Sequence, residues 1–361
     1  MFLTRRAARK SNGGEKNNMS LLEVKHLHTY FKTRKGTVKA VNDVSYSLEP
    51  GKTIGIVGES GSGKSVSAMS ILHLLDGNGY IAEGEILFDG KDLTKLSEQQ
   101  MYDIRGNKIS VIFQEPMTSL NPVFTIEKQL SEPFLIHQGK SKKEAREAAL
   151  RMLYDVQIPN PEAVIKQYPH QLSGGMRQRV MIAMALACKP KILIADEPTT
   201  ALDVTIQAQI LHLMNELQRE NGTSIIFITH DLGVINEMAD DVVVMYCGQV
   251  VEQSSAKVIF ADCKMSHPYT EGLMFSIPRI DNITHKLEPI PGVVPHPLAL
   301  PKGCKFAPRC KYATARCFAE EPELKEVVAG QKIRCFYPEK EVRKSAEHTE
   351  EHRKALINNK S

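Results

Sequence analysis

Short, continuous apolar runs alternate along the chain with longer segments of helical spacing, a pattern typical of α/β proteins. Between residues 21 and 49, apolar and polar positions alternate instead around a turn-like Lys35-Gly36 pair, which predicts an antiparallel β segment. Helical spacing at 67–75, within 125–157 and at 180–187 predicts helices between the buried strands. Residues 242–246 and 248–252 together predict a hairpin that closes the sheet. The continuous runs, each of strand length, are 53–57, 109–113, 191–195, 225–229 and 242–246.

The most informative stretch lies between the first apolar run and the first predicted helix. It reads Gly58-Glu59-Ser60-Gly61-Ser62-Gly63-Lys64-Ser65 and fits the phosphate-loop pattern G-x-x-x-x-G-K-[ST]. Glycines let successive backbone N–H groups point at phosphate oxygens, and the following helix adds its positive N-terminal end. We expect Lys64 to hold the β- and γ-phosphates and the Ser65 hydroxyl to ligate Mg²⁺. The sequence therefore predicts a magnesium-nucleotide site.

Two acids and a histidine follow buried strands and would lie at the same edge of the sheet. Asp196 and Glu197 come directly after the run 191–195, at the position where open α/β sheets bind their ligands. Asp196 is expected to anchor Mg²⁺, directly or through water, and Glu197 to accept a proton from an attacking water. His230 follows the run 225–229 and could reach a terminal phosphate, although a histidine taken alone at such an edge is more often an ordinary loop residue.

A second anion cradle is predicted at Ser173-Gly174-Gly175, where a long apolar helix begins. It offers unpaired N–H groups, a hydroxyl and no Cβ that would block a close approach. Two cradles in one chain require two anions or two chains.

The charge balance gives no reason to expect a nucleic-acid partner. Lys and Arg number 46 against 42 acidic residues, a formal charge of +4. No apolar run approaches the roughly 18 to 20 residues of a membrane-spanning helix. Residues 1–19 are basic but lack the apolar centre of a secretory signal, so a cytoplasmic protein is expected. This segment is interpreted as a disordered tail or an over-extended gene start, with weak attraction to anionic lipid as the alternative.

Four of the seven cysteines, Cys304, Cys310, Cys317 and Cys335, fall within 32 residues near the C-terminus. In a cytoplasmic protein they indicate metal binding or burial rather than disulfides. Their spacing does not match paired C-x-x-C zinc motifs. Their number equals what a [4Fe–4S] cluster needs, and three interpretations stay open: an iron–sulfur cluster, Zn²⁺, or reduced cysteines without a ligand.

Residues 20 to about 260 resemble the ATP-binding subunits of ABC transporters, because every motif of that family occurs in the expected order. The resemblance implies an α/β fold of the P-loop ABC ATPase type, with a RecA-like part, an antiparallel β segment and a helical subdomain at about 115–180. Within it, residues 58–65 match the Walker A loop, Gln114 the Q-loop, and Leu172 to Gln178 the signature. Asp196 and Glu197 match the Walker B magnesium residue and the general base, Ala201-Leu202-Asp203 the D-loop, and His230 the switch histidine.

The resemblance also implies which residues serve which nucleotide. Cassettes of this family dimerise head to tail, so the signature of one closes on the ATP of the other. Lys64, Gln114, Glu197 and His230 would act in catalysis, and Ser65, Gln114 and Asp196 would hold Mg²⁺. The partner's ATP would be met by Ser173, Gly174, Gly175, Gln178 and Asp203. The chain's own ATP would be met by Tyr30, Phe31, Gly58, Ser60, Gly61, Ser62, Gly63, Lys64, Ser65 and Val66. Whether Tyr30 or Phe31 stacks on adenine stays open, as does a purely structural role for both.

Residues 261–338 resemble the C-terminal extension of dipeptide and oligopeptide importers, through His267-Pro268-Tyr269-Thr270 and the four cysteines. Some relatives carry an iron–sulfur cluster in this extension. The implied partners are a second, homologous ATPase subunit, two membrane permeases and, indirectly, a peptide-binding protein. The implied location is the cytoplasmic face of the membrane. Nickel importers share much of this pattern and remain the alternative cargo class. Residues 339–361 are expected to form a charged, solvated tail.

Two other classes of ATPase are disfavoured by the sequence. DNA-repair and chromosome-organising ATPases place a long coiled coil between the phosphate loop and the signature. Here only 57 residues separate Gln114 from Leu172, without sustained heptads. Soluble translation factors of the ABC type normally carry two cassettes in one chain, whereas this chain has one phosphate loop and one signature.

Overall fold

The computed structural model describes residues 20–114, 119–200, 202–261, 264–276 and 289–345. The predictions for the basic segment 1–19, for Ala201 and for residues 346–361 lie outside this part of the chain.

An antiparallel sheet forms where alternation predicted one. Its strand order is β2-β1-β4-β5, and Leu22 pairs with Leu48 across its first two strands. Apolar side chains of the alternating pattern point into the core, and polar ones point away. The prediction for residues 21–49 is confirmed. The strands are β1 (Leu22–Thr33), β2 (Gly36–Leu48), β4 (Gly79–Phe88) and β5 (Lys91–Asp92).

The main sheet has eight strands in the order β11-β12-β10-β9-β3-β8-β7-β6. Strands β6, β7, β8, β3 and β9 are parallel, and β10, β12 and β11 continue the sheet in antiparallel fashion. All five apolar runs form strands of this sheet, which confirms their prediction, and β9 and β10 form the predicted hairpin. The strands are β3 (Thr53–Val57), β6 (Ile109–Ile112), β7 (Ile192–Asp196), β8 (Ser224–Thr229), β9 (Asp241–Tyr246), β10 (Gln249–Ser255), β11 (Lys325–Val328) and β12 (Gln331–Ile333).

Both faces of the parallel part of the main sheet are buried, which explains why β3, β7 and β8 are almost continuously apolar. Along β8, Ile225 and Phe227 face a core shared with the C-terminal extension and with the helical subdomain at about 115–180, called the helical insert below. Ile226 and Ile228 face a second core, shared with α1 and the antiparallel sheet. The phosphate loop follows the neighbouring strand β3, which contributes Ile54 and Ile56 to the second core and Val57 to the first.

The predicted helices form with local end signals. Ser141 and Glu144 make a capping box at the start of α5, and Thr125 caps α4. Helix α1 ends at Ile71, earlier than the apolar spacing predicted, because His73 adopts a left-handed φ of 53°. The helices are α1 (Lys64–Ile71), α2 (Glu98–Tyr102), α4 (Ile126–Gln138), α5 (Lys142–Asp155), α6 (Pro161–Val164), α7 (Gly174–Leu186), α8 (Val204–Asn221), α9 (Leu232–Met238), α10 (Ala256–Phe260), α11 (Pro268–Phe275), α12 (Ala315–Ala319) and α13 (Lys340–Ser345).

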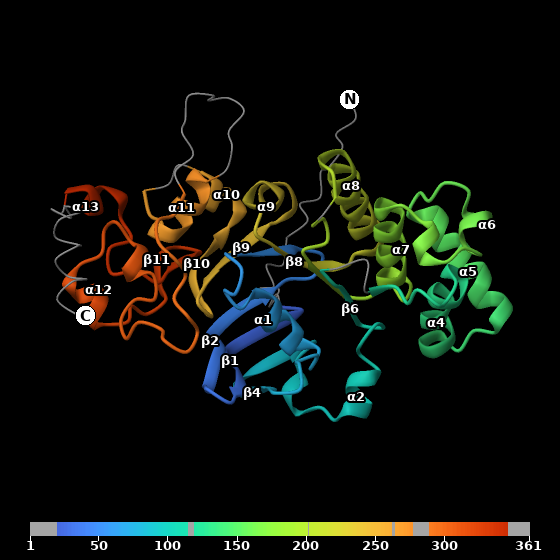
Figure 1. Ribbon diagram of the computed structural model, residues 1–361, viewed down its shortest axis with the longest axis horizontal. Helices are drawn as coiled ribbons and strands as arrows, with labels where there is room; N and C mark the ends of the chain where they lie inside the picture. The colour runs from blue at the N-terminus through green and yellow to red at the C-terminus, as the bar shows by residue number, and fades with distance from the viewer. Residues whose placement is uncertain (1–19, 115–118, 201, 262–263, 277–288, 346–361) are drawn as a thin grey trace, which may run out of the picture.

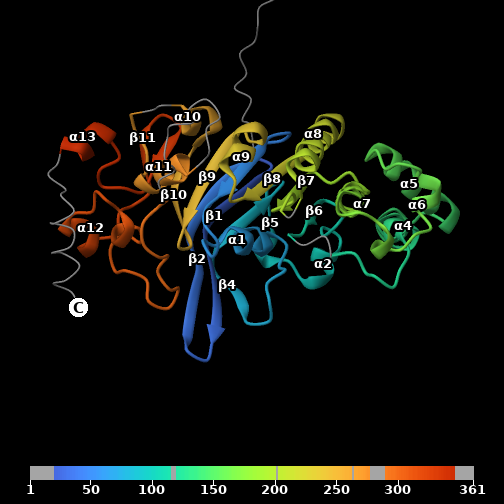
Figure 2. The same cartoon turned by 45° about the horizontal axis from the view of Figure 1, so that its top comes forward.

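The helical insert and the C-terminal extension lie at opposite ends of the molecule. Helices α4 to α7 occupy one end, and α11 to α13 occupy the other together with β11, the edge strand of the main sheet; the other strands lie between them (Figure 1; Figure 2). Among the described residues, none of the helices combines the length and the hydrophobicity that crossing a bilayer requires.

The extension shares its sheet and its core with the nucleotide-binding part. Strand β12 pairs with β10, where Ile333 lies opposite Glu252. Phe306 is 4% exposed and packs against the rings of Tyr246 and Tyr269, at centroid distances of 5.3 and 5.4 Å. The boundary predicted at residue 261 therefore separates two sequence regions within one continuous core.

The charged C-terminal stretch begins differently from the solvated tail that its composition predicts. Residues 340–345 form α13, and Arg343 is 1% exposed. Its guanidinium donates to Glu271 at 2.6 Å and to the carbonyl of Ser266 at 2.6 Å. Arg343 is therefore buried against Glu271, 72 positions away, although the sequence around Arg343 is charged and predicts exposure to solvent.

The shared core leads to a stability prediction. Phe306→Ala should lower the free energy of unfolding of the whole protein by about 3 to 5 kcal/mol, because it removes a fully packed ring. Val328→Ala, at a position in the extension that is 46% exposed, should stay within about 0.5 kcal/mol. Denaturant unfolding followed by both circular dichroism and tyrosine fluorescence measures the two variants. A separate, early transition in Phe306→Ala, with the main transition unmoved, would contradict a shared core.

Candidate nucleotide-binding site

The phosphate loop joins β3 to α1 and is closely packed against neighbouring backbone. A Cβ on Gly58 would lie 2.2 Å from the carbonyl oxygen of Met245, and one on Gly63 would lie 2.4 Å from that of Ala40. Their φ values of 155° and 98° are also ones that side chains rarely allow. The middle of the loop, at Ser60 and Gly61, is exposed. Only glycine fits the two fixed ends, and Ser60 and Gly61 between them face solvent.

One hydroxyl in the loop is buried without a partner. Among the described residues, Ser62 Oγ makes no hydrogen bond, although it is shielded from solvent. A buried polar atom without a partner costs free energy, so such an atom inside a loop of directed amides suits a site that receives an anion. The loop therefore fits a phosphate group.

Lys64 lies folded back over this loop. Its Nζ donates to the carbonyls of Gly58 at 2.8 Å and Glu59 at 3.1 Å, and the side chain is 5% exposed. Burial lowers the pKa of Lys64, while the carboxylates of Glu197, Asp196 and Glu59 oppose that shift. Phosphate oxygens would give this ammonium stronger, charge-assisted partners than the two carbonyls.

Ser65 and Asp196 are brought together from positions 131 residues apart. The Ser65 hydroxyl donates to Asp196 Oδ1 at 3.0 Å. Burial raises the pKa of Asp196, and the hydrogen bond from Ser65 acts in the opposite direction. A hydroxyl and a carboxylate at this edge are oxygen donors of the kind that Mg²⁺ prefers. The pair fits a magnesium ion next to the phosphate loop.

Glu197 lies at the centre of a hydrogen-bonded group. Its Oε2 accepts from Gln114 Nε2 at 3.0 Å and from Thr200 Oγ1 at 2.9 Å, and its Oε1 lies 3.3 Å from His230 Nδ1. Burial would raise the pKa of Glu197, but the hydrogen bonds from Thr200 and His230 outweigh it and the pKa is lowered. The carboxylate is therefore ionised at neutral pH and able to accept a proton. Its φ of 47° is unusual for a glutamate and is of the kind that functional sites retain.

Thr200 is a contributor that the sequence reasoning missed. Its hydroxyl follows Glu197 by three residues, a spacing that could have identified it. Arg309 and Tyr269 were also missed. They contact Glu59 of the phosphate loop from 250 and 210 positions away, and no local pattern connects them.

The second cradle begins α7 and faces solvent. Ser173 caps the helix through a hydrogen bond from the N–H of Met176 at 3.3 Å, and an added Cβ on Gly174 would meet no atom within 4 Å. Asp203 is exposed and caps α8. Gln178 differs from its expected presentation to a partner, because its side chain is 0% exposed and donates to the carbonyl of Pro198 within the same chain.

Tyr30 and Phe31 occupy consecutive positions of β1, so their side chains point to opposite faces of the antiparallel sheet. The Tyr30 hydroxyl donates to Asn42 Oδ1 at 3.1 Å, and its ring lies edge-on to Tyr80 at 6.3 Å. The ring of Phe31 lies against Gly79.

The four cysteines of the extension line one cavity of about 20 Å³, room for about one water molecule. Burial raises the pKa of Cys304 to about 12 and that of Cys335 to about 11, so both thiols are protonated at neutral pH. Among the described residues, no set of three or more His, Cys, Asp or Glu forms a group that could hold a metal ion. The four thiols therefore surround one small cavity, but the described residues give the predicted cluster or zinc no support.

Comparisons with known proteins agree with the motifs. Residues 41–200 match the family model described as ABC transporter, and residues 251–317 match the oligopeptide/dipeptide transporter C-terminal region. The oligopeptide transport ATP-binding protein AppD of Bacillus subtilis is 53% identical over 323 residues, which cover 89% of this chain and 98% of that protein. The dipeptide transport ATP-binding protein DppD of Escherichia coli is 48% identical over 320 residues, covering 89% and 97%.

Solved structures show the same fold. A dimeric post-hydrolysis state of the ATP-binding cassette MJ0796, bound to ADP and phosphate, superposes with a TM-score of 0.59 at 30% identity. The match covers 65% of this chain and 98% of that cassette. With relatives this similar over nearly their whole length, the chain belongs to the ATP-binding subunits of ABC transporters, in the oligopeptide and dipeptide branch of that family.

Proposed function

We propose that this chain hydrolyses ATP to power the import of dipeptides or oligopeptides through partner membrane proteins. The observation that carries the proposal is the convergence of Lys64, the Ser65–Asp196 pair and Glu197 at the carboxyl ends of β3 and β7. The cargo class follows from the relatives, which are named as peptide transport proteins, and from the match of the extension.

The residues divide the hydrolysis of ATP between them. Loop amides and Lys64 bind the phosphates, and Ser65 and Asp196 are the residues that would hold Mg²⁺, which neutralises phosphate charge when bound. Glu197 accepts a proton from water as the water oxygen bonds to the γ-phosphorus, and the bond from that phosphorus to the bridging oxygen breaks to give ADP and phosphate. Gln114 and Thr200 hold the Glu197 carboxylate, and His230 reaches the terminal phosphate.

A second cassette completes the site in this proposal. The exposed cradle at Ser173 to Gly175 would close over ATP held by a partner subunit, and Asp203 would lie in the same interface. Attraction between the cradle and the γ-phosphate gives ATP a higher affinity for the closed dimer than for the open one, and hydrolysis removes it. The dimeric state of the related MJ0796 cassette supports this arrangement, and the peptide branch favours a homologous partner over an identical one.

Replacing the proposed base tests the function. Glu197→Gln should keep ATP affinity and lower turnover by about 10²- to 10⁴-fold, because an amide cannot accept the proton. ATP should also trap the closed dimer. ATPase assays and size-exclusion chromatography on the transporter purified from its host measure both effects. Glu216→Gln, at an acid on α8 away from the site, is the control and should retain normal turnover. Near-normal turnover in Glu197→Gln would remove this residue as the base.

The membrane subunits are proposed to dock beside the Q-loop, at the cytoplasmic face of the membrane. An apolar groove of about 230 Å³ lies there, lined by Leu74, Val111, Phe113, Leu120 and Met184 among others. Phe113 is 45% exposed and directly precedes Gln114, so a helix in the groove would sense movement of the catalytic group.

Docking in this groove can be separated from ATP binding. Phe113→Ser should reduce co-purification of the permeases by about tenfold, as expected for a buried aromatic contact at an interface. ATP affinity of the isolated subunit should be unchanged. Tyr154→Ser, at an aromatic residue on α5 that is 51% exposed, is the control. Full co-purification of Phe113→Ser would place the docking surface elsewhere.

The four cysteines are proposed to bind a [4Fe–4S] cluster with a structural role. Thiolates of a cluster attach to four different irons, so they stand farther apart than the ligands of a single ion. The cavity between Cys304, Cys310, Cys317 and Cys335 would widen to admit the cluster, and binding would add folding free energy to a segment rich in proline. Zn²⁺ is the competing ligand.

Anaerobic purification decides between these ligands. The protein should absorb visible light through sulfur-to-iron charge transfer and contain about four irons per chain. Cys310→Ser should lose both signals, whereas Cys188→Ser, outside the extension, should keep them. Colourless protein without iron would reject the cluster, and about one zinc per chain in elemental analysis would assign Zn²⁺ instead.

A further inference from the structure

In the part of the chain that the structure describes, hydrogen bonds link the C-terminal extension to Glu59 of the phosphate loop. The backbone N–H of Glu59 donates to the hydroxyl of Tyr269 at 2.8 Å. Its carboxylate accepts two hydrogen bonds from the Arg309 guanidinium, at 2.6 and 3.0 Å. Its carbonyl accepts from Lys64. Residue 59 is thus held on one side by the extension and on the other by the lysine that faces the phosphates.

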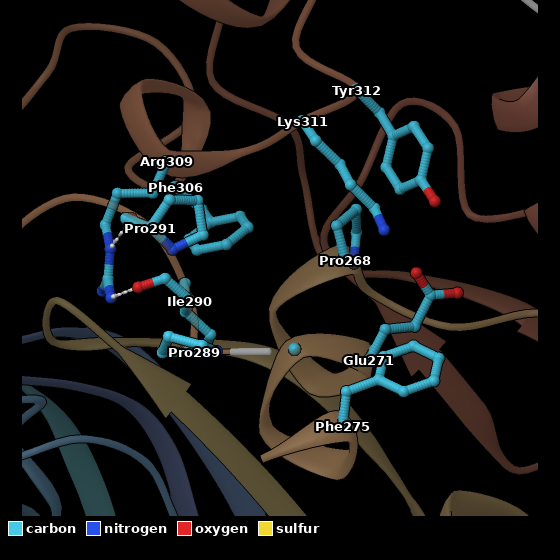
Figure 3. A pocket seen from close by; sticks show the side chains of 11 residues that line it. Pro268, Glu271, Phe275, Pro289, Ile290, Pro291, Phe306, Arg309, Lys311 and Tyr312 are labelled. Atoms are coloured by element: carbon cyan, nitrogen blue, oxygen red, sulfur yellow. Dashed lines mark hydrogen bonds between the residues drawn. The ribbon is translucent and has the colours of Figure 1, made fainter. Parts of the chain in front are cut away.

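The guanidinium of Arg309 is fixed before it meets Glu59. Its Nε donates to the carbonyl of Pro291 at 3.0 Å, and one terminal nitrogen lies 3.4 Å from the carbonyl of Ile290 (Figure 3). Arg309 is 4% exposed, and the Tyr246 hydroxyl lies 3.4 Å from its other terminal nitrogen. A planar guanidinium held in this way presents both remaining N–H groups to one carboxylate in a defined orientation.

The charge of Glu59 makes this pairing important for the nucleotide. Glu59 occupies the second position of a loop that receives a triphosphate, and its carboxylate lies close enough to Lys64 to affect the pKa of that ammonium. An unpaired carboxylate at this position would repel the phosphates and compete with them for Lys64. With Arg309 in place, the negative charge is neutralised.

We propose that Arg309 and Tyr269 are positioning residues for ATP binding, through which the C-terminal extension holds residue 59 and neutralises its carboxylate. This inference rests on the proposed ATPase function. It gives the extension a direct part in the nucleotide site. By linkage, ATP bound to the loop also stabilises the contact between loop and extension.

A charge-rescue experiment tests the proposal. Arg309→Met in the full-length chain should weaken binding of a fluorescent ATP analogue with Mg²⁺ by about tenfold, because Glu59 becomes an uncompensated charge. Adding Glu59→Gln to Arg309→Met should restore affinity to within about threefold of the original, because the repelling charge is gone. A residue that only supported the fold would lower the melting temperature when replaced and leave the ATP affinity of the folded protein unchanged.

Arg334→Met is the matched control. Arg334 also belongs to the extension, is 6% exposed and precedes a cysteine, as Arg309 does. It contacts Asp43 at 3.3 Å and the carbonyl of Val250 at 2.9 Å instead of the phosphate loop. Its loss should leave ATP affinity within about twofold even where it lowers the melting temperature.

The outcomes separate this inference from the proposed function. If the unmodified chain binds no ATP, the proposed function fails. If it binds ATP and Arg309→Met binds equally well, or if Glu59→Gln does not restore affinity, only the positioning role is rejected. Should Arg309→Met fail to fold, Arg309→Lys and Tyr269→Phe replace it. Tyr269→Phe removes the one hydrogen bond from Glu59 N–H, and Arg309→Lys keeps the positive charge but loses the two-point contact with the Glu59 carboxylate. Each should weaken ATP binding by about two- to fivefold, and unchanged affinity in both would overturn the proposal.

Discussion

The site depends on how closely other backbone segments approach the phosphate loop. Met245 near the end of β9 and Ala40 in β2 place carbonyl oxygens where side chains at positions 58 and 63 would otherwise lie. Amides can be directed at an anion without reorganisation only when the loop is fixed in this way. Segments of both sheets, one before the loop in the chain and one long after it, are therefore needed to shape these eight residues. Within the described part of the chain, this shape leaves the buried Ser62 hydroxyl without a hydrogen-bond partner, which costs free energy.

Two adjacent acids, Asp196 and Glu197, have different surroundings that suit them to different roles. Asp196 is the last residue of β7 and faces Ser65 in a buried position, where its pKa is raised. Glu197 follows with a left-handed backbone, and hydrogen bonds from Thr200 and His230 lower its pKa. The backbone turn between the two residues separates a carboxylate suited to a metal from one suited to a proton. Environments that shift neighbouring pKa values in opposite directions are characteristic of acid–base sites.

Local patterns in the sequence predicted the strands, the phosphate loop and the acids that follow β7, because each depends on spacing within a few residues. The role of Gln114 was implied by the family resemblance, since it lies 83 positions from Glu197. They did not predict that β11 and β12 extend the main sheet. Strand β12 has three residues, too few to show a period of two. Arg343 and Arg309 lie in stretches that appear solvated, yet both are buried by partners far away in sequence. Gln178 lies within the signature motif, which gave no indication that its side chain packs inside its own chain.

The helical insert and the C-terminal extension lie on opposite sides of the phosphate loop (Figure 1). The helical insert carries the second cradle at one end of the molecule, and the extension approaches Glu59 from the other (Figure 1). A buried ion pair such as that between Arg309 and Glu59 adds little net stability, because desolvating both charges offsets their attraction. Stability alone is therefore a weak explanation for this pair. Glu59 places a negative charge in a loop proposed to bind an anion, and Arg309, 250 residues later, neutralises that charge. An effect on phosphate binding gives a stronger reason. The same ion pair neutralises the carboxylate of Glu59 and fixes the position of its backbone carbonyl, which contacts Lys64.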